Sequence, residues 1–488
     1  MRLNYIANAI GLAMIYIGVF LLIPICIALY YGEYSSIIPF LSAAIISTLS
    51  GFIIKKYIPK SAQSDNLNDI KKSEALFIVA FSWIIFSIMG CIPYLFYDIT
   101  PLNALFESVS GITTTGATIL STFDYPHAFF FWRSFTQWLG GLGIIVLFIA
   151  ILPQFAVAGR QMFFAETPGP NEDKITPRIK NTASALWKFY LGFTILEILL
   201  LIWAGMPKFD ALCNSLSTLS AGGFSPNPQS IMGYNSNAIN WIVMIFMFLA
   251  GISFNLQNKA LMSKNPLNLF KNEEFRVYLG FVILMGLLIA GSLYFHNSLP
   301  LFENIKNALF QVISITTSSG FASVDFERWN YTSKMLLFIV MFMGACASSA
   351  GGGIKIARWL VVFKAMKSQI LKILHPNAVV NIKIDNKTVQ VDTARQIVVF
   401  VFFWFFIFAI TAILIALIEQ NSAIGLTSAI SSLGNIGPNV ATLTGPFADY
   451  NHLHNVSKII FIINMLVGRL ELIPFLVMFQ KDFWDFRD

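Results

Sequence analysis

The stretch SVSGITTTGATIL, residues 108–120, lies between two long apolar segments, yet it suits neither a membrane-spanning helix nor a soluble catalytic motif. Three later stretches repeat its pattern. Aligned without gaps on one glycine each, the four segments read ALFESVSGITTTGAT (104–118), ALCNSLSTLSAGGFS (211–225), ALFQVISITTSSGFA (308–322) and GLTSAISSLGNIGPN (425–439). In every segment a leucine stands eleven residues, and a serine six residues, before the shared glycine. A recurrence at intervals of roughly a hundred residues marks a repeated structural unit.

Composition places these repeats in a membrane protein. The chain has 488 residues, of which 56% are hydrophobic and only 12% are charged, about half the charged fraction of a typical soluble domain. A transmembrane helix needs about 20 apolar residues. Ten segments can each supply one: 5–30, 36–57, 74–98, 128–153, 183–204, 238–256, 275–296, 331–374 (interrupted), 392–419 and 455–480. We therefore expect an all-α polytopic membrane protein.

The net charge of +7 follows this topology. If the ten spans alternate in direction, most of the 32 lysine and arginine residues fall on one side of the bilayer, including the cluster at 355–395. Positive charge marks the cytoplasmic side, so both termini are expected in the cytoplasm. Membrane topology thus explains the basic residues, and nucleic acid is not an expected partner. The first hydrophobic run has no convincing cleavage site, so we expect it to be retained.

Residues with catalytic or metal-binding chemistry do not cluster as they do in an enzyme. The cysteines Cys26, Cys91, Cys213 and Cys346 are scattered through apolar segments without CxxC spacing, and the five histidines form no metal-binding pattern. The sequence contains no GxGxxG or Walker motif. A polytopic membrane enzyme is therefore disfavoured, no covalently bound cofactor is expected, and any nucleotide control has to come from a partner chain.

Each repeat is expected to contain a long helix, a short apolar helix, a loop with the shared glycine, and a second long helix. The short helix cannot cross a bilayer, and irregular backbone at membrane depth is tolerated only where protein buries it or water lines it. We expect four such loops to converge on one axis and form a pore. Glycine lets carbonyls turn toward that axis, where they can replace the water around an alkali cation, and the helix C-termini add negative potential. The alternative is ordinary helix-packing glycines.

The same segments resemble a known family. ITTTGAT, SAGGFS, TTSSGFAS and LGNIGP are similar to the four selectivity-filter segments of TrkH-type subunits in the bacterial Trk/Ktr/HKT potassium transporter superfamily. FWRSFTQWLGGLGIIVLFIAILP, AETPGP…ITPRI, CASSAGGGIKIARWL and VGRLELIP resemble other landmarks of that family. The resemblance covers nearly the whole chain. It implies a four-repeat pore in one polypeptide, usually paired as a homodimer, with a cytoplasmic nucleotide-binding regulatory subunit of the TrkA type.

The resemblance also implies how the chain is divided. Two additional N-terminal transmembrane helices and a cytoplasmic linker occupy residues 1–72. The four pore repeats then follow at 73–182, 183–274, 275–390 and 391–488. The expected location is the bacterial cytoplasmic (inner) membrane.

Residues around the shared glycines are the expected ligands of K⁺, chiefly through their carbonyl oxygens. They are Thr114, Thr115, Gly116, Gly222, Gly223, Ser319, Gly320, Ile436 and Gly437. Glycine at all four shared positions resembles the potassium-selective members, whereas a serine at the first position is associated with sodium-preferring plant relatives. Pro438 follows the fourth glycine and makes the ring asymmetric.

A run of glycines that interrupts the eighth span is expected to act as a gate. Gly351, Gly352 and Gly353 follow serines in GACASSAGGGIK, residues 344–355, and each costs a helix about 1 kcal/mol relative to alanine. They form either a kink that lets neighbouring helices pack closely or, as the resemblance implies, an unwound segment that obstructs the pore. Lys355 adds positive charge directly after them.

Arg469 lies within the last span, where an uncompensated charge is costly. Either it pairs with a carboxylate such as Glu471 or, as the resemblance implies, it faces the pore as a barrier to cations. The leading hypothesis is thus gated K⁺ uptake, with K⁺ as the transported ion. The alternatives are a proton- or sodium-coupled potassium symporter, for which Glu107 and Glu197 are the only obvious membrane carboxylates, and a less selective K⁺/Na⁺ transporter.

Overall fold

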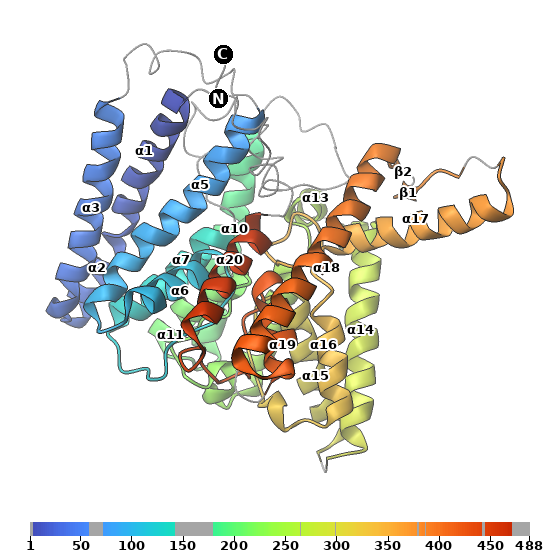
Figure 1. Ribbon diagram of the computed structural model, residues 1–488. Coiled ribbons are helices and arrows are strands. Elements are labelled where there is room, and N and C mark those ends of the chain that lie inside the picture. Colours follow the sequence, from blue (N-terminus) through green and yellow to red (C-terminus); the bar gives the residue numbers. More distant parts are fainter. Residues whose placement is uncertain are drawn as a thin grey trace.

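The structure, a computed structural model, describes residues 3–57, 72–141, 179–263, 265–297, 299–377, 380–385, 387–441 and 445–470. Helices make up nearly all of its regular structure (Figure 1). One antiparallel hairpin, β1 (Lys383–Ile384) with β2 (Lys387–Thr388), is the exception to the predicted all-α class within the described ranges. In the same ranges, five short 3-10 turns connect helices: η1 (Tyr34–Ser36), η3 (Ile92–Phe96), η4 (Ser230–Tyr234), η5 (Pro266–Lys271) and η6 (Phe326–Arg328).

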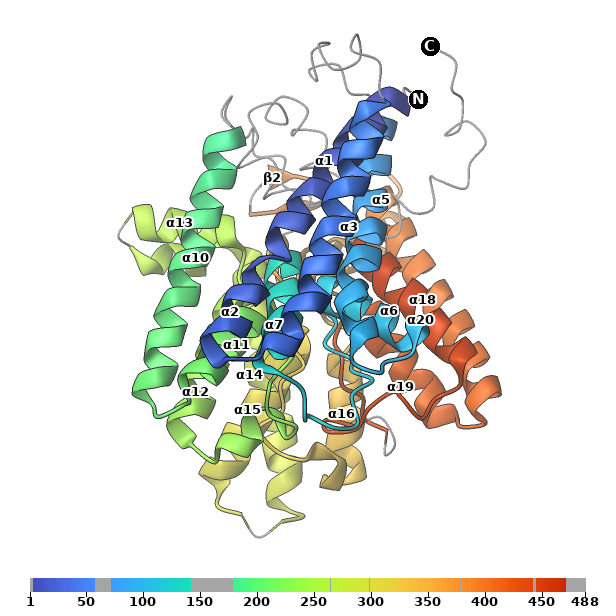
Figure 2. The ribbon, with the colours of Figure 1, turned by 90° about the vertical axis from the view of Figure 1, so that its left-hand side faces the viewer.

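The N-terminal helices lie side by side along one flank of the molecule (Figures 1 and 2). They are α1 (Leu3–Phe20), α2 (Ile23–Tyr31), α3 (Ile37–Lys56) and α5 (Lys72–Cys91). Glycines bring α1 and α3 into close contact, because a Cβ atom added at Gly51 would lie 2.6 Å from the carbonyl oxygen of Gly11. Small residues at such crossings are the usual way for membrane helices to pack.

The helix–short helix–helix pattern occurs four times in the described residues. The long first helices are α5, α10 (Ile179–Trp203), α14 (Glu273–Tyr294) and α18 (Val391–Glu419). The short helices are α6 (Pro101–Ile112), α11 (Lys208–Leu219), α15 (Leu301–Thr316) and α19 (Ser422–Leu433). The second helices are α7 (His127–Gly141), α12 (Asn237–Ala250), α16 (Tyr331–Val340) and α20 (Asn455–Leu470). The short helices have 12 or 16 residues, too few to cross a bilayer.

Six stretches of the described residues are helical, long and apolar enough to span a membrane. They are Ile6–Tyr31, Tyr34–Lys56, Leu76–Phe96, Leu186–Trp203, Glu273–Tyr294 and Val391–Glu419. The chain is therefore a multi-pass membrane protein. The predicted spans 128–153 and 455–480 extend beyond the described parts of α7 and α20, so their full lengths lie outside the described residues.

Two of the predicted spans contain a sharp bend or an irregular segment. The segment 238–256, expected as one span, holds α12 and the start of α13 (Phe254–Met262), and the two helices meet at a bend of 99°. The chain turns at Gly251, where a Cβ atom would lie 2.5 Å from the hydroxyl of Tyr278. In the eighth span, α16 ends at Val340 and α17 (Ile356–Leu374) begins after the glycine run, at the predicted interruption. In Figure 1, α17 lies across the end of α14.

Candidate functional site

The four glycine loops have the same backbone conformation. Each shared glycine has a positive φ, between 73° and 95°: Gly116, Gly223, Gly320 and Gly437. The residue two positions earlier is also left-handed in every loop, with φ between 52° and 57°: Thr114, Ala221, Ser318 and Asn435. Side chains disfavour this region of backbone conformation, and glycine does not. Because residues with side chains occupy the first left-handed position in all four loops, the conformation favours a glycine at the second position but does not by itself require one.

The recurring serine shapes each loop from the end of the short helix. Its carbonyl oxygen accepts a hydrogen bond of 2.9 Å from the N–H of the residue before the shared glycine, in all four loops. In three loops its hydroxyl also donates to a carbonyl at or just after that glycine: Ser110 to Ala117 (2.5 Å), Ser314 to Phe321 (2.7 Å) and Ser431 to Gly437 (2.8 Å). The hydroxyl of Ser217 has no such partner among the described residues. The serine thus holds the loop backbone.

The loops contact one another in a closed cycle through their glycines. A Cβ atom added at any shared glycine would collide with the carbonyl oxygen of the residue that precedes the next loop's glycine. The pairs are Gly116 with Gly222 (2.1 Å), Gly223 with Ser319 (1.9 Å), Gly320 with Ile436 (2.4 Å) and Gly437 with Thr115 (2.4 Å). The fourth loop thereby returns to the first. All four glycines also line one cavity of about 70 Å³.

The predicted ligand residues are therefore brought to one place. Thr115, Gly222, Ser319 and Ile436 supply the carbonyls at the four junctions, each packed against a shared glycine. Thr114 directly precedes Thr115 and is buried, and its hydroxyl has no hydrogen-bond partner in the described part of the chain. Carbonyl groups are the ligands that strip water from alkali cations in membrane pores.

Gln137 is a part of this site that the sequence analysis missed. It lies on α7, is fully buried, and donates from Nε2 to the carbonyl of Gly222 at 2.7 Å. Its Oε1 accepts from the N–H of Phe224 at 3.0 Å. The amide thus clamps the second loop on both sides of Gly223. A glutamine within an apolar span was the available signal, because buried polar side chains need partners.

The glycine run of the broken eighth span contacts the third and fourth loops. Cβ atoms at Gly351 and Gly352 would lie 2.7 Å from the carbonyl oxygen of Thr317 and 2.4 Å from that of Gly434. The N–H of Gly352 also donates to the hydroxyl of Ser318 at 2.6 Å. The segment therefore fits against the ends of two short helices only because it has no side chains there.

Arg469 joins this broken segment to α7. Its guanidinium donates to the carbonyl of Ala350 at 2.9 Å and to that of Gly140 at 2.7 Å. Glu471, the carboxylate partner that the sequence offers, lies outside the described residues. Lys355 donates from Nζ to the carbonyl of Gly351, and Gly353 has a left-handed φ of 67°. All five predicted gate residues thus belong to one contiguous assembly beside the loops.

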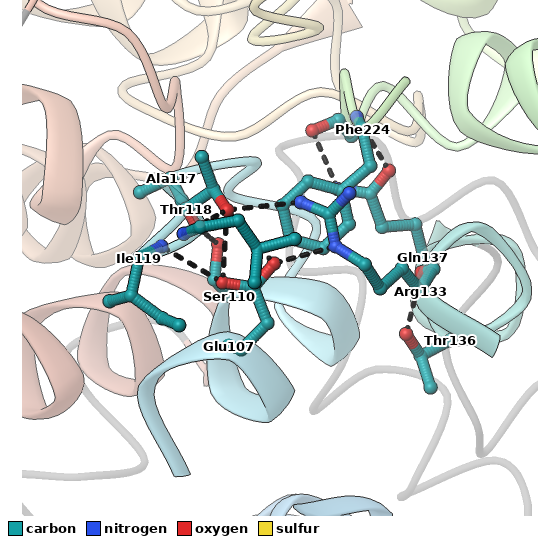
Figure 3. A network of polar contacts seen from close by, with 11 residues as sticks. Glu107, Ser110, Ala117, Thr118, Ile119, Arg133, Thr136, Gln137 and Phe224 are labelled. Carbon is teal, nitrogen blue, oxygen red and sulfur yellow. Dashed lines mark hydrogen bonds and ion pairs between the residues drawn. The ribbon is translucent and has the colours of Figure 1, made fainter. Parts of the chain in front are cut away.

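A buried ion pair supports the first loop from outside the cycle (Figure 3). Arg133 on α7 donates from Nε to Glu107 on α6 at 2.6 Å, and the two side chains are 2% and 0% exposed. Glu107 also accepts from the hydroxyl of Thr118 and from the N–H of Ile119. The guanidinium lies 4.0 Å above the ring of Phe224 in the second loop. The charge of Glu107 is thus paired with that of Arg133, so Glu107 is not a free carboxylate.

Substituting one member of this pair is expected to destabilise the fold. Arg133→Met leaves the Glu107 carboxylate buried without its charge partner, which costs about 3–5 kcal/mol. The double variant Glu107→Gln/Arg133→Met removes both charges and should recover much of that loss. Thermal unfolding of the purified protein in detergent measures both effects. Equal melting temperatures for wild type and Arg133→Met would contradict the assignment.

An acidic side chain, that of Glu327, lies next to the cavity. The carboxylate of Glu327 packs against Gly445, which lines the cavity. Burial and the neighbouring Asp325 raise the pKa of Glu327. Asp325 itself pairs with Arg328 at 2.9 Å. No group of three or more His, Cys, Asp or Glu side chains that could hold a metal ion occurs in the described ranges.

Long apolar helices around a cycle of carbonyl-bearing loops define the class of multi-span membrane transport proteins. Residues 41–485 match the family model described as "TrkH: Cation transport protein", so the chain belongs to the TrkH family. It is 34% identical, over 99% of its length and 100% of theirs, to the Trk system potassium uptake proteins TrkH of Salmonella typhimurium and Escherichia coli K12. This family assignment confirms the predicted resemblance and the prediction of a transporter rather than an enzyme.

Comparison with a solved structure also supports the assignment to this family. The chain superposes on the crystal structure of the potassium transporter TrkH from Vibrio parahaemolyticus with a TM-score of 0.88 and 30% sequence identity. The match covers 99% of this chain and 100% of that one. The fold is therefore the helical multi-span fold of that structure.

Proposed function

We propose that this chain takes up K⁺ across a bacterial cytoplasmic membrane, through a pore formed by its four repeats. The observation that carries the proposal is the closed cycle of four glycine loops around one cavity. Its junction carbonyls are suited to a dehydrated alkali cation, and the short helices direct their C-terminal ends toward the same loops. The full-length relatives of the chain are named as potassium uptake proteins.

In this proposal, the nine predicted residues around Gly116, Gly223, Gly320 and Gly437 form the selectivity filter. The repeats occupy 73–182, 183–274, 275–390 and 391–488, after two additional helices in 1–72. The segment with Gly351, Gly352 and Gly353 and the side chains of Lys355 and Arg469 form the gate. Contacts of this segment with the third and fourth loops support the assignment.

The protein is further proposed to work as a homodimer with a cytoplasmic, nucleotide-binding regulatory subunit of the TrkA type. Both termini are placed in the cytoplasm, as the distribution of lysine and arginine in the sequence indicates. No nucleotide-binding motif occurs in the sequence, which is consistent with nucleotide control through a partner.

Ion flux into reconstituted vesicles tests the proposal. We expect the wild type, with its regulatory subunit, to conduct K⁺ and Rb⁺ in preference to Na⁺. Gly116→Ser places a side chain against the carbonyl of Gly222 and should lower the K⁺/Na⁺ flux ratio by about tenfold or more, since 1.4 kcal/mol of lost discrimination corresponds to a factor of ten. Folded wild-type protein that carries none of these cations would rule out the pore.

A second candidate is proton-coupled potassium symport, which Glu197 favours. This residue lies on α10, is fully buried, and neither carboxylate oxygen has a hydrogen-bond partner among the described residues. Ionisable groups within membrane spans often serve in proton transfer. Accumulation of K⁺ against its gradient when only a proton gradient is applied would favour symport, and loss of that accumulation in Glu197→Gln would assign the coupling to this residue.

A further inference from the structure

Glu274 is a buried carboxylate that contacts the broken segment from a different helix. It is the second residue of α14 and is 6% exposed. Its Oε1 accepts hydrogen bonds from the N–H of Ala347 at 2.5 Å and from the N–H of Ala357 at 3.2 Å. Ala347 lies near the start of the segment 344–355, and Ala357 lies just after its end. One oxygen atom therefore binds both ends of the segment, beside the two backbone hydrogen bonds that join these ends directly, Gly344 to Ile354 and Ile356 to Ala345.

The helix start that carries Glu274 is fixed independently of the segment. Asn272 caps α14 by accepting from the N–H of Phe275 at 2.9 Å. Asp385, in the turn of the hairpin, accepts from the side chain of Asn272 and from the N–H of Glu273, both at 2.6 Å. Glu273 pairs with Lys364 of α17 at 2.5 Å. The Glu274 carboxylate thus extends from an anchored support.

The two N–H groups that Glu274 binds have particular need of an acceptor. Ala357 is in the first turn of α17, whose N–H groups have no partner within the helix, and a negative charge there is favoured by the helix dipole. Ala347 belongs to irregular backbone, and the N–H of a neighbouring residue, Cys346, donates to the carbonyl of Gly251. Leaving buried donors unpaired is costly. A rearrangement of the segment must therefore break or replace the Glu274 contacts.

Contacts elsewhere on the segment involve different residues. Ser318 and Arg469 bind its central part, at Gly352 and Ala350, whereas Glu274 binds its two ends. The central contacts connect the segment to the loops and to α7. The Glu274 contacts connect it to α14, the first long helix of the third repeat.

We propose that Glu274 is a positioning residue of the gate, which holds segment 344–355 in its obstructing conformation by binding both of its ends. This inference rests on the proposed function, because it assumes that the segment obstructs ion passage. Loss of the carboxylate releases the segment and favours the conducting state. The selectivity of the loops is unaffected, because Glu274 contacts none of them in the hydrogen bonds described above.

A native cysteine reports directly on this contact. Cys346 precedes Ala347 and is 1% exposed. In full-length protein with Cys26, Cys91 and Cys213 replaced by alanine, the rate of reaction with a small membrane-permeant maleimide measures opening of the segment. Glu274→Met keeps the volume of the side chain and removes its acceptors. We expect it to raise the Cys346 reaction rate by about tenfold or more, since a hydrogen bond to a charged group changes an equilibrium by at least that factor.

Conservative and control variants separate positioning from packing. Glu274→Gln keeps an oxygen acceptor without the charge, so its reaction rate should lie between those of wild type and Glu274→Met, because charge-assisted hydrogen bonds are the stronger ones. Asp392→Asn makes the same carboxylate-to-amide change at the second residue of α18, an exposed position away from the segment, and should match the wild type. K⁺ flux without the regulatory subunit should rise in the same order, with an unchanged K⁺/Na⁺ ratio. Size-exclusion profiles and melting temperatures confirm folding.

A variant that lacks residues 350–353 tests the gate role of the segment separately from the role of Glu274. If this deletion leaves K⁺ flux unchanged, the segment is not a gate, and the inference falls with that part of the proposed function. If the deletion raises flux while Glu274→Met leaves both flux and Cys346 reactivity at wild-type levels, only the role of Glu274 is rejected. If Glu274→Gln and Glu274→Met both react at the wild-type rate, packing and not hydrogen bonding holds the segment, and the inference is rejected.

Discussion

Gly223→Ala is expected to abolish K⁺ flux. The added methyl group would lie 1.9 Å from the carbonyl oxygen of Ser319, the closest of the four glycine–carbonyl contacts. Gly223 also has a φ of 77°, which costs a residue with a side chain about 1–2 kcal/mol. The loops can relieve the collision only by moving apart, which displaces the Ser319 carbonyl from the cycle. A misplacement of about 1 Å in a site that depends on geometry typically reduces its rate by about a hundredfold.

The control for this substitution is Gly192→Ala. Gly192 lies on α10, in the same repeat, and an added Cβ atom there meets no atom within 4 Å. Both variants insert the same methyl group, so a general effect of alanine on the membrane helices would appear in both. Rb⁺ uptake into vesicles with matched protein content gives the comparison. Uptake by Gly223→Ala within about twofold of wild type would show that the glycine cycle does not line the ion pathway.

The repeated unit could be predicted from the sequence because it depends on local properties. Apolar length distinguishes the long helices from the short ones, and the shared Ser and Gly of each segment recur at fixed spacing. The physical reason for the recurring glycine is the left-handed φ at Gly116 and its three equivalents together with the neighbouring carbonyl oxygen, which leaves no room for a Cβ atom. The bend within the predicted span 238–256 could not be predicted in this way, because hydropathy measures only apolar length and does not register the turn that divides α12 from α13.

The supporting residues could not be predicted, because their roles depend on contacts between distant parts of the chain. Gln137 acts on Gly222, Arg133 on Glu107, and Glu274 on Ala347. In the sequence each is only a polar residue in or beside an apolar segment. Such residues indicate that a partner exists, since buried polar groups are paired, but only the arrangement of the helices identifies the partner. The order of the loops in the cycle could not be predicted either, because it also depends on the arrangement of the helices.

The second large effect is expected at Arg469, where Arg469→Gln should raise K⁺ flux in the absence of the regulatory subunit. The substitution removes the donors to Ala350 and Gly140, which hold the broken segment to α7. It also removes a positive charge from beside the loops, where the proposed pathway runs. Each hydrogen bond from a charged group is worth about 1.5–3 kcal/mol, so we expect an increase of about tenfold or more. The control Arg276→Gln makes the same change at an exposed position on α14.

Arg469→Lys separates the two effects of the arginine. Lysine keeps the positive charge, but its single ammonium group cannot reproduce the planar, forked geometry with which the guanidinium reaches the carbonyls of Ala350, Gly140 and Gly141. If the arginine acted only as an electrostatic barrier, Arg469→Lys would conduct like the wild type, and if it acted only as a tether, Arg469→Lys would conduct like Arg469→Gln. Since the charged side chain lies beside the loops and also donates to carbonyls of the broken segment and of α7, we expect the flux of the lysine variant to lie between those of wild type and Arg469→Gln. Wild-type flux in Arg469→Gln would show that the arginine neither obstructs the pathway nor holds the segment that does.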